Sequence, residues 1–351
     1  MKNLSKILIS ILFLGLFLIG CTSTSSNDML YKYLKNNKYG FVDSKGNIVV
    51  EAIYDKVNNF SDGLAAVMKD EKLSFIDLTG NIQFDISANY ISNFESCNFI
   101  EGRCAIGTDT GYSLIDREGN IVTNKKYDYI HNIANGFAIY RDDSTLYGLM
   151  TLDGEEVLED KYAFLQNFSD GLIAFKDSNS GNYGYINEYG VVIIEPTFKE
   201  VKNFINGIAL VKDTRYNDAK WFTPINKEGE IVTVETHYPS VLKYSDSTYL
   251  VSANYKLGFI DDSGETIIDT IYDFSTNVDT LTHGFSEGLA AVRVDKGVGF
   301  INKQNEMIIP PQFDGIIENF NNDIAIVTKD DKWLYINKDG EILFEININD
   351  D

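Results

Sequence analysis

One short phrase returns nine times along this chain of 351 residues. It consists of an aromatic or aliphatic residue, Ile or Val, Asp or Asn, two further residues, Gly, one residue, and Ile or Val, and several copies depart from it at one to three positions. The Gly position falls at residues 46, 80, 119, 154, 190, 229, 264, 305 and 340, so successive copies are 34 to 41 residues apart. A period of this length is typical of a chain that stacks many copies of one small structural unit.

The phrase has the chemistry of a tight turn between two β-strands. The Asp or Asn side chain caps the turn backbone with hydrogen bonds. Gly adopts the positive φ that the turn requires, at which the Cβ of another residue would clash. The clearest copies predict these hairpin-turn residues: Asp43, Gly46, Asp77, Gly80, Asp116, Gly119, Asn187, Gly190, Asp261, Gly264, Asn337 and Gly340.

Two further phrases complete each unit. A Gly-Leu-Ala-Ala-Val pattern, clearest at residues 63–67 and 288–292, precedes the turn phrase. A Tyr-Asp-x-Val link, clearest at residues 54–57, joins one unit to the next. Each unit is therefore predicted to be an antiparallel meander of three strands, with a possible fourth short strand in the link.

The strands need neighbours on both faces, because adjacent residues such as Phe75 and Ile76 are both large and apolar. Stacked units would supply that cover. The predicted fold class is all-β, a tandem array of about nine small antiparallel β-meander repeats of about 37 residues each. The array is either an open curved solenoid or propeller-like, and nine units exceed the usual four to eight blades, which favours the open form.

This pattern resembles the bacterial WG-repeat (KWG) family, whose repeat contains Tyr-Asp-x-Val, Gly-Leu-Ala-x-Val, Trp-Gly-Phe-Ile-Asp-x-x-Gly and Ile-Pro-Pro. The resemblance covers residues 30 to 345. The departures are in the name-giving pair: Tyr147 and Tyr183 precede a Gly in place of Trp, whereas Trp333 is followed by Leu. The resemblance implies the repeat fold and no particular reaction.

The N-terminus has the features of an export signal. A basic start precedes an apolar run over residues 7–18, which is shorter than the roughly 20 residues that cross a bilayer. The Leu-Ile-Gly-Cys that ends the run resembles the lipobox of bacterial lipoproteins, in which the Cys thiol receives a diacylglycerol and becomes the first residue after cleavage. The resemblance implies that Cys21 is lipidated.

The sequence therefore predicts three parts. A lipoprotein signal peptide occupies residues 1–20, the lipidated Cys and a flexible polar tether occupy 21–29, and a WG-like β-repeat domain occupies 30–351. We expect the protein to be exported and anchored to the cell membrane, facing outside the cytoplasm.

Two cysteines, Cys97 and Cys104, lie within the repeat domain. In an exported protein such a pair can form a disulfide. The alternative is two unrelated small hydrophobic residues.

The net charge of −22 and the absence of a basic stripe argue against a nucleic-acid partner, because affinity for phosphate backbones comes mainly from Lys and Arg. A search for catalytic and metal motifs finds none. The three histidines, His131, His237 and His283, are scattered, and no zinc, Walker or nucleophile-elbow pattern is present. No cofactor, metal site or catalytic residue is predicted.

Two repeated features have both a functional and a structural interpretation. The acidic turns could bind calcium, but several hold a Lys or Arg, such as Lys227 and Lys338, so the turn interpretation is favoured. One Phe per unit could form a sugar- or peptide-binding ridge, but its constant place in the repeat favours core packing. These residues are Phe60, Phe99, Phe168, Phe204, Phe285 and Phe320.

A functional surface is expected where the units differ, for instance in the longer connections at 213–220 and 276–283. The predicted function is a non-catalytic binding or scaffold module for an unidentified protein or cell-envelope ligand. The alternatives are an envelope enzyme acting on glycans, which clustered acids at a break in the repeat would favour, and a purely structural spacer.

Overall fold

The computed structural model describes residues 29–86, 94–142, 145–214, 219–232, 238–273, 284–295 and 297–348. Over these residues the regular structure consists of β-strands and one short 3-10 helix, η1 (Phe94–Ser96). The all-β fold class predicted from the sequence is confirmed. Among the described residues no helix is long and apolar enough to cross a membrane. The predicted signal peptide, Cys21 and tether lie outside this part of the chain.

The strands form eight hydrogen-bonded sheets. The first four sheets are β1 (Tyr31–Lys35), β2 (Lys38–Val42) and β3 (Ile48–Tyr54); β4 (Lys56–Val57), β5 (Leu64–Lys69), β6 (Lys72–Asp77) and β7 (Ile82–Asp85); β8 (Cys104–Thr108) and β9 (Gly111–Ile115); and β10 (Tyr129–Ala134), β11 (Phe137–Arg141), β12 (Tyr147–Thr151) and β13 (Glu156–Tyr162). A six-stranded sheet then holds β14 (Phe164–Leu165), β15 (Ile173–Lys176), β16 (Tyr183–Ile186), β17 (Val192–Val201), β18 (Ala209–Asp213) and β19 (Thr223–Ile225). The last three sheets are β20 (Ser240–Ser245), β21 (Thr248–Ala253), β22 (Lys256–Asp261) and β23 (Thr266–Asp273); β24 (Phe285–Ser286), β25 (Leu289–Val294), β26 (Gly297–Ile301) and β27 (Met307–Phe313); and β28 (Gly315–Asn321), β29 (Ile324–Lys329), β30 (Lys332–Ile336) and β31 (Ile342–Asn347).

The repeated turn has the same backbone hydrogen bonds at all nine positions. In the first copy, the Gly46 amide donates to the Asp43 carbonyl and the Asp43 amide donates to the Asn47 carbonyl, both at 3.0 Å. The side chain that opens the turn adds further bonds, as where Asp116 Oδ1 accepts from the Asn120 amide at 2.8 Å. We number the units one to nine in the order of these turns.

Nine turns correspond to eight sheets because one strand serves two units. β17 pairs with β16 through its first residues and with β18 through its last. Elsewhere the chain bends between units, as at Asp55, which separates β3 from β4. Units five and six are therefore joined in one sheet, whereas the sequence predicted separate meanders.

The Gly of the Trp-Gly position lies at a β-bulge. The register between β12 and β13 shifts across this residue, Gly148, between Tyr147 and Leu149, and again between Leu149 and Met150. A Cβ at Gly148 would lie 2.6 Å from the Leu158 carbonyl oxygen on the neighbouring strand. A residue without a side chain is required where the two backbones approach so closely.

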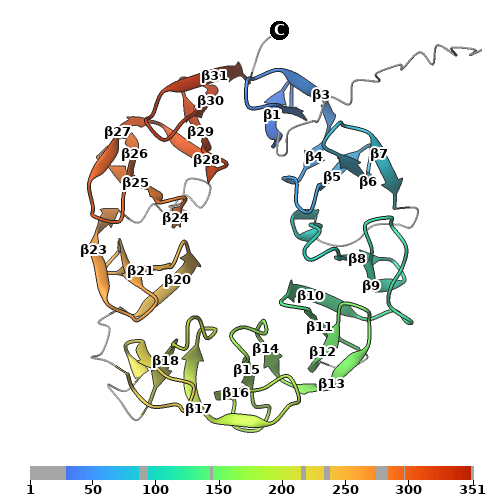
Figure 1. The fold of residues 1–351 in the computed structure, drawn as a ribbon, viewed down its shortest axis with the longest axis vertical. Helices are drawn as coiled ribbons and strands as arrows, with labels where there is room; N and C mark the ends of the chain where they lie inside the picture. Colours follow the sequence, from blue (N-terminus) through green and yellow to red (C-terminus); the bar gives the residue numbers. More distant parts are fainter. Residues whose placement is uncertain are drawn as a thin grey trace, which may run out of the picture.

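The possible fourth strand forms in seven of the nine units, and it is the innermost. Figure 1 shows β4, β10, β14, β20, β24 and β28 toward the central opening of the ring, and β7, β13, β23, β27 and β31 at its outer rim. Two units depart from this plan. The sheet of unit one has only β1 to β3, and in unit three the 3-10 turn η1 stands where unit two has β4.

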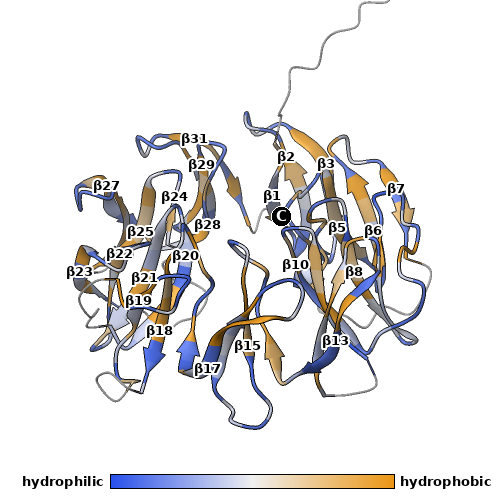
Figure 2. Cartoon of the chain, turned by 60° about the horizontal axis from the view of Figure 1, so that its bottom comes forward, coloured by the Kyte–Doolittle hydropathy of each residue, from blue (hydrophilic) through white to orange (hydrophobic). Residues whose placement is uncertain are grey.

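The hydrophobic core lies between neighbouring sheets, as the pairs of adjacent apolar residues predict. Phe41 of β2 and Phe60 of the next unit meet with ring centroids 4.9 Å apart. Figure 2 shows that hydrophobic residues follow the strands, while many of the connecting turns are hydrophilic. Each sheet is thus covered on both faces by its neighbours.

The units close into a ring, so the preference for an open array was wrong. Six of the turn glycines pack on the outer strand of the preceding unit, as Gly119 does on Phe84, and Gly46 of unit one makes the same contact with Phe344 of unit nine. Lys32 Nζ lies 2.8 Å from Glu318 Oε1, and the Tyr335 hydroxyl donates to the Lys32 carbonyl at 2.7 Å. No strand is exchanged between the chain ends among the described residues, and side-chain contacts close the ring.

Candidate binding surface of the ring

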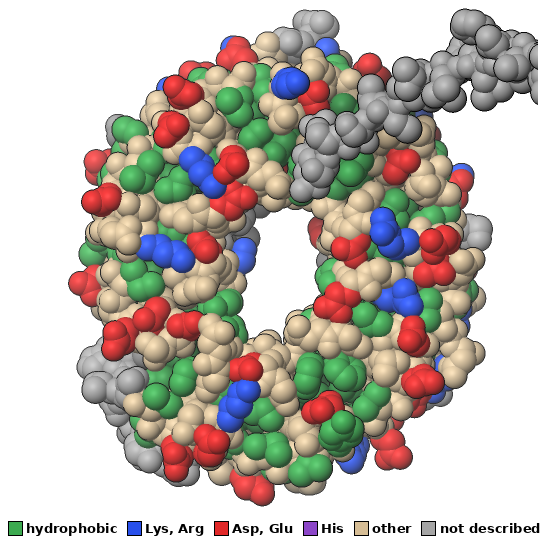
Figure 3. All heavy atoms as spheres, viewed as in Figure 1, with side chains coloured by type: hydrophobic (Ala, Val, Ile, Leu, Met, Phe, Trp, Pro, Cys, Tyr) green, Lys and Arg blue, Asp and Glu red, His purple; other side chains and the backbone are tan. Residues whose placement is uncertain are grey.

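The inner strands form the wall of a central opening, which the space-filling view shows to be unfilled (Figure 3). On the face shown there, acidic side chains are mixed with Lys and Arg and form no extended patch of one sign.

A chain of charge-assisted hydrogen bonds fixes neighbouring units to each other. In five units an acidic side chain in the turn after the inner strand accepts a bond from a backbone amide of the next unit, and charged acceptors of this kind are stronger than neutral ones. The bonds run from Gly102 N to Asp62 (2.8 Å), from Gly136 N to Glu101 (2.7 Å), from Gly207 N to Asp170 (2.6 Å), from Gly288 N to Asp246 (2.8 Å) and from Asn322 N to Glu287 (2.7 Å).

The lysines of the repeated turns bind these same acids. Lys227 Nζ lies 2.7 Å from Asp170, and Lys338 Nζ lies 3.0 Å from Glu287. The pKa of Lys338 is raised by its hydrogen bond to Asp323 and by Glu287, although burial opposes the shift. These acids therefore have both backbone and lysine partners, whereas Asp116, in a repeated turn, accepts from the backbone of its own turn. In the described part of the chain, no group of three or more His, Cys, Asp or Glu is placed to hold a metal ion.

The Phe residue that returns in each unit belongs to the core. Phe60, Phe99, Phe204, Phe285 and Phe320 are buried, and their rings pack against aromatic residues of the neighbouring strand, as Phe99 does on Phe75 at 5.2 Å. Phe168 is partly buried beside Phe137. A ligand ridge built from these residues is therefore excluded for the five buried members.

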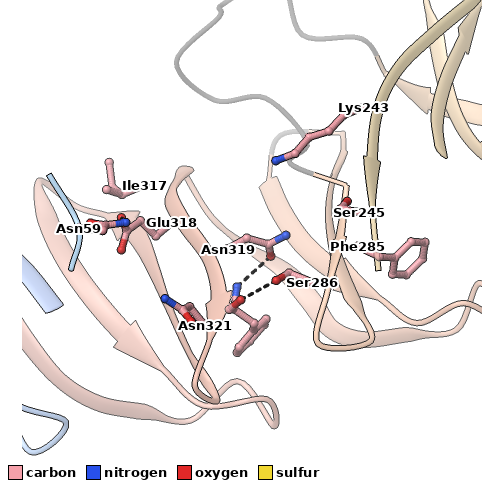
Figure 4. Close-up of a pocket in the computed structure, with 10 residues that line it drawn as sticks. Asn59, Lys243, Ser245, Phe285, Ser286, Ile317, Glu318, Asn319 and Asn321 are labelled. Atoms are coloured by element: carbon pink, nitrogen blue, oxygen red, sulfur yellow. Dashed lines mark hydrogen bonds between the residues drawn. The ribbon is translucent and has the colours of Figure 1, made fainter. Parts of the chain in front are cut away.

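One cavity of about 340 Å³ lies on the wall between β20, β24 and β28. The close-up in Figure 4 shows Asn319 and Ser286 at its centre, where the Ser286 hydroxyl donates to the Phe320 carbonyl at 2.7 Å. Glu318 is its one acidic lining residue, and it is held by Lys32 and by the side-chain amide of Asn59. This carboxylate is therefore engaged in ring closure.

A second cavity, of about 370 Å³, lies where unit three departs from the repeat. β10 packs beside β8, since unit three has no inner strand between them. The lining residues are Ser96, Asn98, Ile100, Ala105, Tyr112, Tyr129, Ile130, His131, Asn132, Ile133 and Asn167. None of them is Asp, Glu, Lys or Arg, which is unusual in a chain of this charge.

Six aromatic side chains run in a continuous row from this cavity across three units. Successive ring centroids lie 4.9 to 6.4 Å apart, and all six rings are partly exposed. The row consists, in order, of Tyr112, Tyr129, His131, Tyr147, Phe164 and Tyr183. We call these residues the aromatic row. Arg141 lies over Tyr129 at 5.9 Å and Lys176 over Tyr183 at 5.4 Å.

His131 stands at the middle of the row with its Nε2 unpaired. Burial lowers the pKa of His131, while its hydrogen bond to Asn132 opposes this shift and the nearby Arg141 adds to it. The imidazole is therefore neutral at pH 7 and behaves as a polar aromatic ring.

A group of paired titratable residues lies at the junction of units three and four. Glu156 accepts hydrogen bonds from the hydroxyls of Tyr127 and Tyr140, each at 3.1 Å, and pairs with Lys125 at 2.9 Å. These hydrogen bonds lower the pKa of Glu156, and the bond from Lys125 has the largest effect. Burial and Glu156 raise the pKa of Tyr127 to about 12. Lys125 also pairs with a second carboxylate, that of Asp142, so the two acids share one lysine.

Cys97 and Cys104 are both buried in the core cluster between units two and three, and neither is disulfide-bonded here. The two thiols are neighbours. A hydrogen bond to Cys97, together with burial, raises the pKa of the Cys104 thiol. The disulfide stays a prediction.

The ring of antiparallel meanders stacked around a central opening defines a β-propeller. The chain belongs to the family described as "WG containing repeat", whose profile matches residues 39–72, 112–145, 147–179, 183–213, 258–297 and 299–333. The expected family is therefore confirmed, with six matched repeats against nine turns.

The solved structures that resemble this chain are distant in sequence. A crystal structure described as "the eukaryotic initiation factor" is 10% identical, with a TM-score of 0.62 over 92% of this chain and 96% of that one. BamB from Moraxella catarrhalis is 11% identical over 90% and 93%, with a TM-score of 0.44, and apo AztD from Citrobacter koseri is 15% identical over 82% of each chain, with a TM-score of 0.38. The first likeness concerns the fold alone. No curated protein sequence matches the chain.

The aromatic row was not predicted, although its signal is visible in the sequence. Tyr112, Tyr147 and Tyr183 occupy the family's Trp position in three successive units. At the same position Phe222 and Trp333 are buried. The partial exposure of the three tyrosines depends on what packs over them, which the sequence alone does not state.

Proposed function

We propose that this protein is a lipid-anchored, extracytoplasmic β-propeller that binds a protein or cell-envelope ligand and has no catalytic activity of its own. The observation that carries the proposal is the position of the second cavity. It lies on the channel wall at a break in the repeat, and it continues into a partly exposed row of aromatic residues. Concave, largely apolar surfaces with a few polar groups are the usual binding sites of proteins.

The same geometry favours binding over glycan hydrolysis. A glycosidase needs two carboxyl groups about 5 to 10 Å apart across a substrate cleft. The second cavity has no acidic lining residue, and the first has only Glu318, which pairs with Lys32. A further cavity of about 400 Å³ is lined by Asp77 and Glu118 beside Arg117, and the Asp77 carboxylate is held by hydrogen bonds from its own turn. The spacer alternative is disfavoured because the units differ on their exposed surfaces, most of all at the aromatic row.

The binding proposal is tested with the mature protein purified from membranes in detergent. It is used to capture partners from the producing organism's envelope proteins, and separately from its purified peptidoglycan, at physiological salt. We expect a saturable partner that survives added salt. If both fractions give no retained partner while circular dichroism shows a folded β-rich protein, the binding proposal is wrong. Release of reducing sugar from the peptidoglycan would overturn the non-catalytic part.

The anchor is tested separately, with Cys21→Ser. The motivation is the Leu-Ile-Gly-Cys motif that ends the apolar N-terminal run. Loss of the acyl chains removes stable membrane attachment, since a lipidated residue with more than one chain binds the bilayer strongly. We expect wild-type protein in the membrane fraction with a lipid-modified N-terminal peptide by mass spectrometry. An unmodified Cys21 in protein exported normally would contradict the anchor.

A further inference from the structure

We propose that the second cavity and the aromatic row together bind an uncharged glycan chain. This inference rests on the proposed binding function and specifies its ligand class. The site begins in the cavity beside β10 and extends over β12, β14 and β16.

The cavity offers neutral hydrogen-bonding groups. Asn98, Asn132 and Asn167 contribute side-chain amides, and each amide presents both donors and acceptors. Asn167 makes no hydrogen bond to the rest of the described chain. A sugar hydroxyl also donates and accepts, so these amides match it without requiring a charge on the ligand.

The aromatic row offers flat apolar surfaces at intervals. Each ring is partly exposed, and consecutive centroids are 4.9 Å (Tyr129 to His131), 5.7 Å (His131 to Tyr147), 6.0 Å (Tyr147 to Phe164) and 6.4 Å (Phe164 to Tyr183) apart. A pyranose ring has an apolar C–H face that stacks on such a surface, while its hydroxyls point to the sides. A row that crosses three units fits a chain of several sugars better than a single small molecule.

The charges around the site favour an uncharged polymer. The chain carries a net charge of −22, which repels polyanions such as nucleic acids and phosphate-rich polymers. Arg141 and Lys176 already lie over the faces of Tyr129 and Tyr183, so a cationic ligand would meet like charges there. A proline-rich peptide also binds aromatic grooves, but its imide carbonyls accept hydrogen bonds only, whereas the cavity presents amides of both kinds.

The site exists because of two breaks in the repeat. The 3-10 turn η1 replaces an inner strand and opens the cavity, and Tyr129 and Phe164 take the third position of the Tyr-Asp-x-Val link, where unit two has Lys56. His131 lines the cavity, and its Nε2 is buried without a hydrogen-bond partner. A buried polar atom without a partner is a site that a ligand hydroxyl can satisfy.

The test measures binding of two uncharged probes, an N-acetylglucosamine tetrasaccharide and a glucose tetrasaccharide, to the full-length protein in detergent by calorimetry. A proline-rich peptide is titrated in parallel. We expect one tetrasaccharide to bind and the peptide not to bind. The variants Tyr129→Leu and Tyr147→Leu keep apolar volume but lose the flat ring, and we expect each to weaken binding about tenfold or more.

The matched control is Tyr189→Leu, which removes a tyrosine that is 75% exposed and outside the row. It should leave the dissociation constant unchanged. A second readout needs no variant. Bound tetrasaccharide should protect Tyr129 and Tyr147 from nitration in the wild-type protein and leave Tyr189 reactive.

Three results would overturn the inference: binding of neither tetrasaccharide, binding of the peptide alone, or equal losses in Tyr189→Leu and the row variants. Failure here is distinguishable from failure of the proposed function. If Tyr129→Leu and Tyr147→Leu still capture the envelope partner, the protein is a binding module whose binding site lies outside the aromatic row. If wild-type protein captures nothing, the broader proposal falls with it.

Discussion

At the scale of single residues, the repeat depends on positions where the backbone takes a positive φ, which glycine adopts most readily. Gly119 has φ +83° and sits against the Phe84 ring of the preceding unit, with 2.7 Å from the position of a Cβ to the nearest ring carbon. Gly136 has φ +85° but no heavy atom within 4 Å of that position. Substitutions at the two glycines can therefore be compared to separate the cost of backbone strain at positive φ from the cost of steric overlap with the preceding unit.

We predict that Gly136→Ala lowers the free energy of unfolding by about 1 kcal/mol, because Ala is strained at positive φ. Gly119→Ala should cost about 1 to 3 kcal/mol more, since the new methyl also overlaps Phe84. Urea denaturation at equilibrium measures both. Equal losses for the two variants would show that the turn does not pack on the preceding unit.

The paired carboxylate of Glu156 predicts a pH dependence. Its folded-state pKa lies below the ordinary value of 4.5, first because of the hydrogen bond from Lys125. The stabilisation is therefore present above pH 4.5 and is lost as the pH falls through the lower folded-state pKa. Glu156→Gln should lower the free energy of unfolding by about 1 kcal/mol at pH 7, after allowance for its partial exposure, and by less at pH 3.

The control for this experiment is Glu159→Gln, which changes an exposed acid on the same strand, β13. It should leave stability within about 0.5 kcal/mol at either pH. A loss for Glu156→Gln that does not diminish at low pH would mean that packing, and not the carboxylate charge, is responsible.

At the scale of elements, the units were predictable because the signals are local. A turn of four residues is closed by hydrogen bonds within its own backbone and to the side chain of the Asp or Asn that begins it. Asn187 and Gly190 therefore predict the hairpin from the sequence alone. The inner strand was predicted only as a possibility, because its link sequence is short and variable. The continuous strand β17 was missed for a similar reason, since nothing in the sequence around Lys199 marks the absence of a bend.

The bonds between units make a prediction at the same scale. Asp170 accepts from the Gly207 amide at 2.6 Å and from Lys227 at 2.7 Å. Asp170→Ala should lower the free energy of unfolding by about 1 to 2 kcal/mol and speed hydrogen exchange at the Gly207 amide. The same change at the exposed Asp269 is the control. Unchanged exchange at Gly207 in Asp170→Ala would contradict the role of this bond.

At the scale of the whole molecule, closure could not be predicted from the repeats. Whether stacked units form a ring depends on the small rotation between neighbouring units, summed over the whole array. No single repeat phrase in the sequence determines that sum. The aromatic row has the same origin. Its residues are visible in sequence, but Tyr129 and Tyr147 become neighbours of His131 only when β10 and β12 join one sheet. The candidate site therefore required the structure.

The closed ring is the claim on which the channel wall and its cavities depend, and zero-length carbodiimide cross-linking of the full-length protein tests it directly. We predict a cross-linked peptide that joins Lys32 to Glu318, whose side chains lie 2.8 Å apart although they stand in the first and last units. Lys227 and Asp170, in adjacent units and 2.7 Å apart, provide the internal control. Detection by mass spectrometry of the Lys227–Asp170 product without the Lys32–Glu318 product would contradict closure of the ring and support the open array instead.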